Sequence, residues 1–313
     1  MNRGGLRGEL LIAAAACCWG ASAVLGRALL AGRLAQRFGP VALSEMRNLI
    51  AVALLFPMLA CFRRGGVKLA WRLAWRALVL GVIGLAASNY FYYVAIARTN
   101  VATAIIVEYS APIWVLLVLV VRRVQRPTLA RAGAVLLACT GIALVLNLAQ
   151  PGGALRLDRL GIAAALLAAL AFAYYNLAGE RLVKAADPLL VSLYMLAGAT
   201  AVFVLLRPPW RIVQAHTGLR EWGYVLVFSL LATLVPTLLY LAGLRHVDPT
   251  RAVVTSCLEP VSAILLAAAF LGERLAWPQV VGVACVLAAI LFAQKRDRAA
   301  YNDKPGLQAG LAR

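Results

Sequence analysis

The sequence has few charged residues, and acidic ones are the scarcest. Of 313 residues, 14% are charged and 63% are hydrophobic, and 12 aspartates and glutamates stand against 31 lysines and arginines. A soluble domain usually carries about a quarter charged residues, and no polar block here is large enough to form a separate soluble domain. These shortages exclude an ordinary soluble protein and predict an integral membrane protein.

The sequence also lacks what a metal site, a disulfide framework or a catalytic centre requires. It has two histidines, both expected in loops, and its six cysteines fall in or at the end of apolar runs without metal-ligand or secreted-framework spacing. No aspartate lies well inside an apolar run. A membrane-embedded enzyme would need a nucleophile with a base, paired aspartates or a metal. We therefore expect free thiols, no metal, no cofactor and no enzymatic activity.

Long apolar runs are what the sequence has instead. Most have the roughly 17–25 residues that a helix needs to cross the hydrocarbon core. The strands of a membrane barrel would alternate apolar and polar residues, whereas these runs are apolar on every side. We therefore predict an all-α membrane protein with ten transmembrane helices, at about 9–29, 41–61, 77–97, 101–121, 129–148, 160–179, 188–206, 222–244, 250–271 and 277–293.

The first apolar run has a second interpretation. Basic residues precede it, and Ala21-Ser22-Ala23 fits the cleavage site of a secretory signal. Cleavage would leave nine helices and break the two-fold repeat described below, so we interpret the run as the first helix.

Basic residues are concentrated in alternate loops. With a cytoplasmic N-terminus, the inner segments hold about twice as many lysines and arginines as the outer loops, chiefly in 62–76, 122–131 and the C-terminal tail. This positive-inside bias predicts that both termini are cytoplasmic. The basic charge is then a topology signal and a contact for anionic lipid, not a nucleic-acid surface.

The two halves of the sequence resemble each other. The same four residue types recur in the same order, with spacings that agree to within about two residues, at Tyr93, Arg98, Pro112 and Gly133 and again at Tyr240, Arg245, Pro260 and Gly282. Each half holds five predicted helices, and an odd number makes the second half enter the membrane from the opposite side. We therefore predict two inverted five-helix repeats, residues 1–150 and residues 151–313, the second ending in a short basic cytoplasmic tail. Inverted repeats are typical of secondary transporters; a duplicated scaffold without transport is the alternative.

Several short motifs resemble the EamA-type branch of the drug/metabolite transporter superfamily. They are Trp19-Gly20, the segment PVALSEMR at 40–47, Glu259-Pro260 and the segment LGER at 271–274, and the resemblance covers about residues 9–293. The resemblance implies a permease, most often an exporter of amino acids, other small metabolites or drugs. It also implies a central cavity between the first, third, fourth, sixth, eighth and ninth helices. The first half has RRVQR at 122–126 where the second has Gly272-Glu273, so this corner differs between the halves.

Few ionisable side chains lie well inside the predicted helices, and such residues are functional candidates by default. Arg47 and Glu108 each lie seven or eight residues into a helix, about 10–12 Å below the outer surface. We expect a salt bridge between them, or one between Arg47 and Glu45, and either a structural or a gating role for Arg47. Glu45 is nearer the interface and is expected to face lipid headgroups.

Glu259 differs from the other acids. It lies about ten residues into the ninth helix, near the midplane, with no basic residue a turn away. Pro260 weakens this turn because it removes a backbone donor, and Pro112 has the corresponding place in the first half. Glu259 is therefore a candidate for substrate or proton binding, and Glu108 a weaker one. A protonated glutamate that is hydrogen-bonded within the bundle is the alternative.

Aromatic and amide side chains form the remaining candidates. Rings at depth can line a site that accepts apolar groups and still offers hydroxyls, and they can equally serve helix packing. The candidates for the cavity are Trp19, Tyr93, Trp114, Tyr174, Asn176 and Tyr240.

The function that we favour is a permease that exports amino acids or similar small metabolites by alternating access, as a monomer or homodimer. A carrier for phosphorylated or nucleotide-linked metabolites is the alternative, although it should show several deep basic residues.

Overall fold

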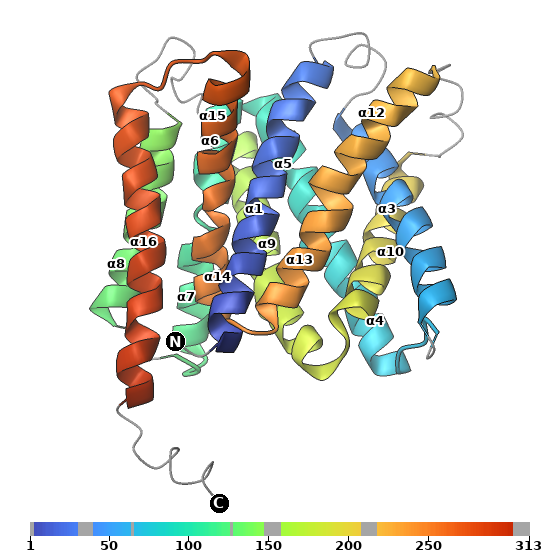
Figure 1. Ribbon diagram of the computed structural model, residues 1–313, viewed down its shortest axis with the longest axis horizontal. Helices are drawn as coiled ribbons and strands as arrows, with labels where there is room; N and C mark the ends of the chain where they lie inside the picture. The colour runs from blue at the N-terminus through green and yellow to red at the C-terminus, as the bar shows by residue number, and fades with distance from the viewer. Residues whose placement is uncertain are drawn as a thin grey trace, which may run out of the picture.

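The computed structural model describes residues 3–30, 40–63, 66–125, 128–146, 158–207 and 218–302 (Figure 1). These residues contain helices and no strand. Eight helical spans in the described part are long and apolar enough to cross a membrane, and two further apolar helices, Leu129–Val145 and Trp277–Ala293, are shorter. The all-α membrane class is confirmed, and the count of ten transmembrane helices stays a prediction.

The helices follow one another in a simple order. In the chain they are α1 (Arg3–Leu30), α3 (Pro40–Phe62), α4 (Trp71–Val79), η1 (Leu80–Ala86), α5 (Ala87–Arg98), α6 (Val101–Glu108), α7 (Ala111–Val121), α8 (Leu129–Val145), α9 (Arg159–Ala185), α10 (Pro188–Leu206), α12 (Leu219–Ser229), η2 (Leu230–Leu234), α13 (Val235–Leu244), α14 (Pro249–Ser256), α15 (Leu258–Leu271) and α16 (Trp277–Asn302), where η1 and η2 are π-helical.

The helices stand side by side in one bundle, with α1 beginning and α16 ending at the same end (Figure 1). We call this the terminal end and the opposite one the far end. At one edge of the bundle α8 packs against α16. Glycine permits this close approach, since a Cβ on Gly282 would lie 2.6 Å from the carbonyl oxygen of Gly141. α1 and α9 lie nearer the middle and carry much of the largest buried core, which includes Ile12, Tyr175 and Leu182.

Two of the long spans are broken in the middle. Val101–Val121 divides into α6 and α7, and Pro249–Leu271 divides into α14 and α15. Pro112 lies in the first turn of α7 and Pro260 in the first turn of α15, where a residue without an N–H costs no intrahelical hydrogen bond. The weakened turn predicted at Pro260 is therefore a break in the helix.

A polar residue caps the first half-helix of each broken span, α6 and α14. The side chain of Asn100 accepts a hydrogen bond from the backbone of Thr103 and so caps α6. Asp248 caps α14 in the same way, through the backbone N–H of Arg251 at 3.1 Å. The capped half-helices α6 and α14 each have eight residues, and they end at Glu108 and Ser256. The two breaks therefore come at equal distances from their caps.

Candidate functional site

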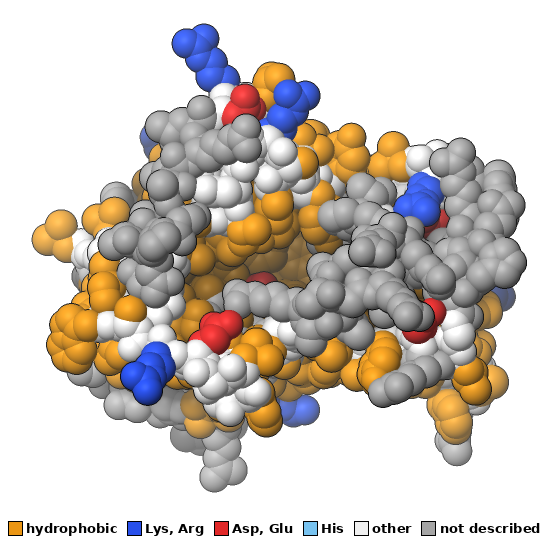
Figure 2. All heavy atoms as spheres, turned by 90° about the horizontal axis from the view of Figure 1, so that it is seen from above, with side chains coloured by type: hydrophobic (Ala, Val, Ile, Leu, Met, Phe, Trp, Pro, Cys, Tyr) orange, Lys and Arg blue, Asp and Glu red, His pale blue; other side chains and the backbone are white. Residues whose placement is uncertain are grey.

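The far end of the bundle is hollowed at its centre. Figure 2 shows this hollow from above, lined by hydrophobic side chains and with acidic atoms on its floor. The packing of the two broken spans accounts for its shape. On the terminal side α14 packs against α1, α7 and α9, whereas on the far side α6 packs mainly against α9 and α15 mainly against α1. The half-helices α7 and α14 thus contact each other at the terminal end, whereas α6 and α15 pack against different neighbours at the far end.

Both deep glutamates lie at the helix breaks. Glu108 is the last residue of α6, Glu259 is the second residue of α15, and both are partly exposed. The hydroxyl of Ser88 lies 3.4 Å from a carboxylate oxygen of Glu108, and the hydroxyl of Tyr109 is a hydrogen-bond partner of Glu259. The two carboxylates interact electrostatically, and Tyr92 is near enough to interact with both. One site therefore contains both acids.

The predicted depths of the two acids stay predictions. Glu108 ends the eight-residue half-helix α6, and Glu259 comes three residues after the eight-residue half-helix α14. A half-helix of this length rises about 12 Å, which is less than half of a hydrocarbon core about 30 Å thick. What the structure adds is that the two breaks bring the acids close enough to interact.

Arg47 reaches the same site from α3. It donates a hydrogen bond to the side-chain oxygen of Asn89, and Asn89 donates to the carbonyl of Leu85 at 2.7 Å. Among the described residues Arg47 forms no ion pair with Glu108 or Glu45, so both predicted salt bridges are wrong. Asn89 holds the guanidinium instead, and Arg47 interacts electrostatically with Glu259 without a direct contact.

Glu45 is fully buried, which contradicts the prediction that it faces lipid headgroups. The beginning of α3 packs against α12, where Ala42 and Met46 contact Val225. Neither carboxylate oxygen of Glu45 has a hydrogen-bond partner in the described part of the chain. Arg207, at the end of α10, is the cation that interacts with it electrostatically.

Asn176 and Tyr240 belong to the packed core. Both are 0% exposed, and the Tyr240 hydroxyl donates to the Asn176 side chain at 2.6 Å. The amide of Asn176 donates in turn to the carbonyl of Phe172 at 2.8 Å. Trp19 packs on this core, its ring 5.3 Å from that of Tyr240. In this structure the polar groups of Asn176 and Tyr240 bond each other inside the bundle, and their predicted cavity role stays a prediction.

The other aromatic candidates are partly exposed. The hydroxyl of Ser44 donates to that of Tyr93 at 2.8 Å, which ties α3 to α5. The indole N–H of Trp114 donates to the hydroxyl of Ser110 at 3.0 Å, next to the break between α6 and α7. Tyr174 packs at the rim of the core around Tyr240. For these three side chains the cavity role stays a prediction.

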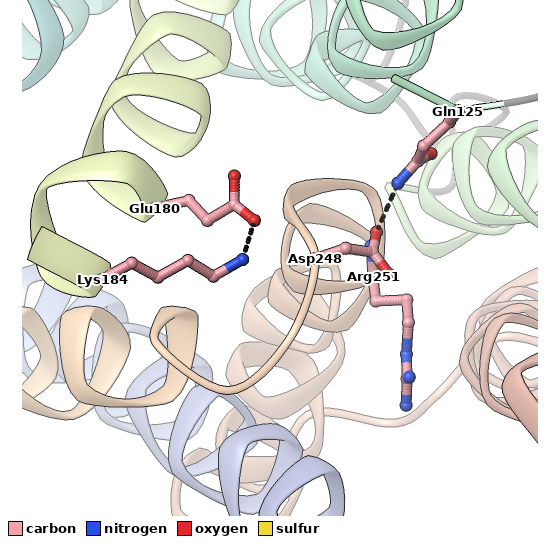
Figure 3. A network of polar contacts seen from close by, with 5 residues as sticks. All are labelled: Gln125, Glu180, Lys184, Asp248 and Arg251. Atoms are coloured by element: carbon pink, nitrogen blue, oxygen red, sulfur yellow. Dashed lines mark hydrogen bonds and ion pairs between the residues drawn. The ribbon is translucent and has the colours of Figure 1, made fainter. Parts of the chain in front are cut away.

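Polar contacts that the sequence did not reveal close the terminal end. Glu9 on α1 forms an ion pair with Arg251 on α14, and their side chains are 6% and 14% exposed. Gln125, in the turn after α7, donates to Asp248 at 3.2 Å and accepts from Thr250 at 3.1 Å. Figure 3 shows Gln125 reaching Asp248 above Arg251. Glu9 and Arg251 both lie near the predicted cytoplasmic face, and their opposite charges are the signal in the sequence that could have indicated this pair.

Two glycines bring α1 and α13 together at the same end. A Cβ on Gly243 would lie 2.6 Å from the carbonyl oxygen of Gly8, and a Cβ on Gly8 would lie 2.9 Å from that of Gly243. Since neither backbone can yield at such a distance, only glycine fits. The terminal end is therefore closed by packing as well as by polar contacts.

The described residues show no metal site. No three histidine, cysteine, aspartate or glutamate side chains in the described ranges lie close enough together to hold an ion. The six cysteines are all free thiols, of which Cys257 is buried at the break before α15. The polar chemistry at the centre of the bundle therefore comes from carboxylates, a guanidinium and tyrosine hydroxyls.

Comparisons with known proteins indicate a transporter family. The sequence profile of the EamA-like transporter family matches residues 6–147 and again residues 159–294. An uncharacterized transporter of Archaeoglobus fulgidus is 29% identical over 218 residues, which cover 68% of this chain and 75% of that protein. The threonine/homoserine exporter RhtA of Escherichia coli (strain K12) is 28% identical over 272 residues, 86% of each chain. A solved crystal structure shares the fold, with a TM-score of 0.75 and 21% identity over 94% of this chain and 98% of that one.

Proposed function

Because this chain belongs to the EamA-like transporter family, we propose that it is a secondary permease that exports amino acids or similar small metabolites. The family and the names of the relatives indicate a multi-pass membrane transporter rather than an enzyme, and the resemblance read from the sequence is confirmed. The substrate class and the outward direction form the proposed part. Their support is the relative named a threonine/homoserine exporter, which is 28% identical across 86% of both chains.

The proposed architecture has ten transmembrane helices in two inverted repeats, residues 1–150 and 151–313, with both termini in the cytoplasm of a bacterial inner membrane. The two profile matches fall on either side of this boundary. The local irregularities also recur in order, since η1 and η2 interrupt one span of each half and the breaks at Tyr109 and Cys257 interrupt the next. The basic loops would contact anionic lipid, and the functional unit would be a monomer or homodimer.

The proposed mechanism is alternating access around the two helix breaks. The observation that carries it is the meeting of Glu108 and Glu259 at two helix breaks, together with the hollow at the far end that has acidic atoms on its floor (Figure 2). Half-helices that end in mid-membrane leave backbone groups and charged side chains available to a polar substrate, as in other transporters with broken helices. In this proposal Glu259 binds the substrate or a proton, Glu108 and Arg47 adjust the charge of the site, and Pro112 and Pro260 keep the breaks in place. Trp19, Tyr93, Trp114 and Tyr174 would contact the substrate from the sides.

Transport into proteoliposomes tests the proposal. Purified protein would be assayed with a panel of amino acids and amines, with and without a pH gradient. We expect at least one amino acid to move, and we expect Glu259→Gln to lose most of the transport or its dependence on the pH gradient. Glu180→Gln is the matched control, because Glu180 pairs with Lys184 on its own helix at the terminal end. Proton coupling is wrong if Glu259→Gln leaves both the rate and its pH dependence unchanged, and the substrate class is wrong if no amino acid or amine moves.

A further inference from the structure

We propose that the site binds its substrate as a zwitterion, with the carboxylate of the substrate at Arg47 and its amino group at Glu259 and Glu108. The proposal rests on the proposed function and makes it more specific. It names which end of an amino acid each charged residue recognises, and it therefore predicts which derivatives the protein rejects.

The charges of the site are not satisfied by one another. Among the described residues Glu108, Glu259 and Arg47 form no ion pair, although Arg47 and Glu259 interact electrostatically. Charges inside a membrane bundle are costly and usually pair with a partner. The protein instead anchors each one by a neutral group: Ser88 at Glu108, Tyr109 at Glu259 and Asn89 at Arg47. These neutral partners hold the three side chains in place, and they keep the two carboxylates from direct contact with the guanidinium.

A molecule that carries both charges would satisfy this arrangement. An ammonium group placed at the carboxylates and a carboxylate placed at the guanidinium would each gain a charge-assisted hydrogen bond. The partial exposure of all three side chains leaves room for such contacts. Two acids and one arginine make up the site, so the amino group has two acceptor side chains and the carboxylate has one donor side chain.

The test compares threonine with threoninamide, which lacks the carboxylate, and with N-acetylthreonine, which lacks the amino group. A site built around a polar group rejects analogues without it, so we expect threonine to move about tenfold faster than either derivative. Arg47→Gln should lower threonine transport to the rate of threoninamide and leave the threoninamide rate within about twofold. Glu259→Gln should remove the preference over N-acetylthreonine in the same way.

Three comparisons keep the test decisive. Arg122→Gln and Glu180→Gln remove an exposed arginine and the glutamate that pairs with Lys184, and both should keep the wild-type ratios. Asn89→Leu removes the hydrogen-bond partner of Arg47 and should shift the threonine-to-threoninamide ratio in the same direction as Arg47→Gln. A shift in this ratio indicates altered recognition, because misfolding would lower both rates equally.

Equal loss of threonine and threoninamide transport in Arg47→Gln would overturn the proposal. Amino acids and their amides moving equally in the wild type would overturn it too, while a panel in which no amino acid moves contradicts the proposed function itself.

Contacts at the other end of the bundle carry a second inference independently. We infer that Glu9, Gln125 and Arg251 form a latch that holds the terminal end closed. The contacts described above converge on the start of α14: Glu9 binds Arg251, and Gln125 binds Asp248 and Thr250. α14 is a half-helix that the break at Cys257 separates from α15. It is therefore an element that can move away from α1 and α7 while α15 stays against α1.

The interior of the closed end provides a reporter for this movement. Val253 on α14 is 1% exposed and packs with Ala111 and Val115 of α7 and Ala169 of α9. The reporter is Val253→Cys in a variant whose six native cysteines are replaced by serine. Its thiol would react with a membrane-impermeant reagent only when α14 separates from these helices. We expect slow labelling from the terminal side when the latch is intact.

Breaking the latch should expose this reporter. Arg251→Gln should raise the labelling rate from the terminal side about tenfold, which corresponds to about 1.4 kcal/mol. The exchanged pair Glu9→Arg with Arg251→Glu should restore slow labelling, because the two charges are again opposite. Lys184→Gln, which breaks the neighbouring pair within α9 (Figure 3), is the control and should change nothing. Unchanged labelling in Arg251→Gln, or no restoration in the exchanged variant, would overturn the latch.

Discussion

The terminal end and the far end of this bundle are built from the same helices and differ in how those helices are joined. At the terminal end α1, α13 and α14 meet through a glycine contact, an ion pair and the side chain of Gln125. At the far end the half-helices α6 and α15 lean on separate neighbours around the hollow seen in Figure 2. In hydrocarbon, helix association depends on close packing and polar contacts rather than on apolar burial. The terminal end has both kinds of contact between α1, α13 and α14, whereas among the described residues α6 and α15 pack against different helices around the hollow.

The comparison also separates two uses of charge. At the terminal end Glu9 and Arg251 neutralise each other in contact. At the breaks Glu108, Glu259 and Arg47 lie near one another without an ion pair in the described part of the chain. A paired charge holds two helices together, whereas an unpaired one at mid-depth is available to a ligand. Four substitutions test how packing, hydrogen bonds and charges hold the two ends and the core between them, from the largest expected effect to the smallest.

Arg251→Gln should destabilise the protein most, because it leaves the carboxylate of Glu9 buried without its cation. Breaking a buried pair by removing one partner costs about 3 kcal/mol. Thermal unfolding in detergent would measure the loss, with the double variant Glu9→Gln and Arg251→Gln as the comparison. The double variant should be the more stable of the two, since it leaves no lone charge. A double variant that is less stable than the single one would contradict this account.

Gly243→Val should come next. The new Cβ would lie 2.6 Å from the backbone oxygen of Gly8 and would force α1 and α13 apart. Overpacking of this kind costs about 2 kcal/mol, and a melting temperature lower by several degrees should result. Gly133→Val is the matched control, because nothing lies within 4 Å of a Cβ at that position on α8. Equal melting temperatures for the two variants would show that the close approach does not matter.

Tyr240→Phe removes a hydrogen bond from the core between the two ends. The lost bond to Asn176 should cost about 1 kcal/mol, because the oxygen of Asn176 keeps no partner. Thermal unfolding would again measure the change, and Tyr194→Phe, which removes a hydroxyl 3.2 Å from the carbonyl of Val67, is the control. Transport should fall far less than in Glu259→Gln, because Tyr240 and Asn176 are 0% exposed and bond each other. A large loss of transport with unchanged stability would instead place Tyr240 and Asn176 in the substrate site.

Glu45→Gln should have the smallest effect on stability. Its carboxylate is buried at α3 with no hydrogen-bond partner among the described residues, so the wild type already bears the cost of desolvating it. A neutral amide lowers that cost, which offsets the lost attraction to Arg207. We expect the melting temperature to stay within a few degrees of wild type, or to rise. A loss as large as that of Arg251→Gln would show that Glu45 is a paired charge and would remove the contrast between the two ends.

Local features of the sequence were sufficient to predict part of the site. The apolar runs predicted membrane-spanning helices because their length and composition suffice for that inference. Pro112 and Pro260 marked the breaks because proline acts on its own turn. Glu259 stood out as a mid-depth acid for the same local reason, and it does lie at a break.

Contacts between helices were beyond the sequence. The predicted partner of Arg47 was Glu108 or Glu45, and the partner in the structure is Asn89. Glu45 was expected at the headgroups and is buried. Both errors concern the direction in which a helix turns its faces. A helix that is apolar on every side has no hydrophobic face to indicate that direction.

By itself, the sequence determined that this protein is a helical membrane protein of a transporter family, that its halves share a pattern, and where two of its helices break. These properties depend on length, composition and local backbone chemistry. Only the tertiary structure decided that the two breaks bring Glu108 and Glu259 into one site, that Arg47 faces them without an ion pair, and that Glu9 and Arg251 close one end. These depend on the rotation of each helix about its axis and on its choice of neighbours, which packing between helices sets.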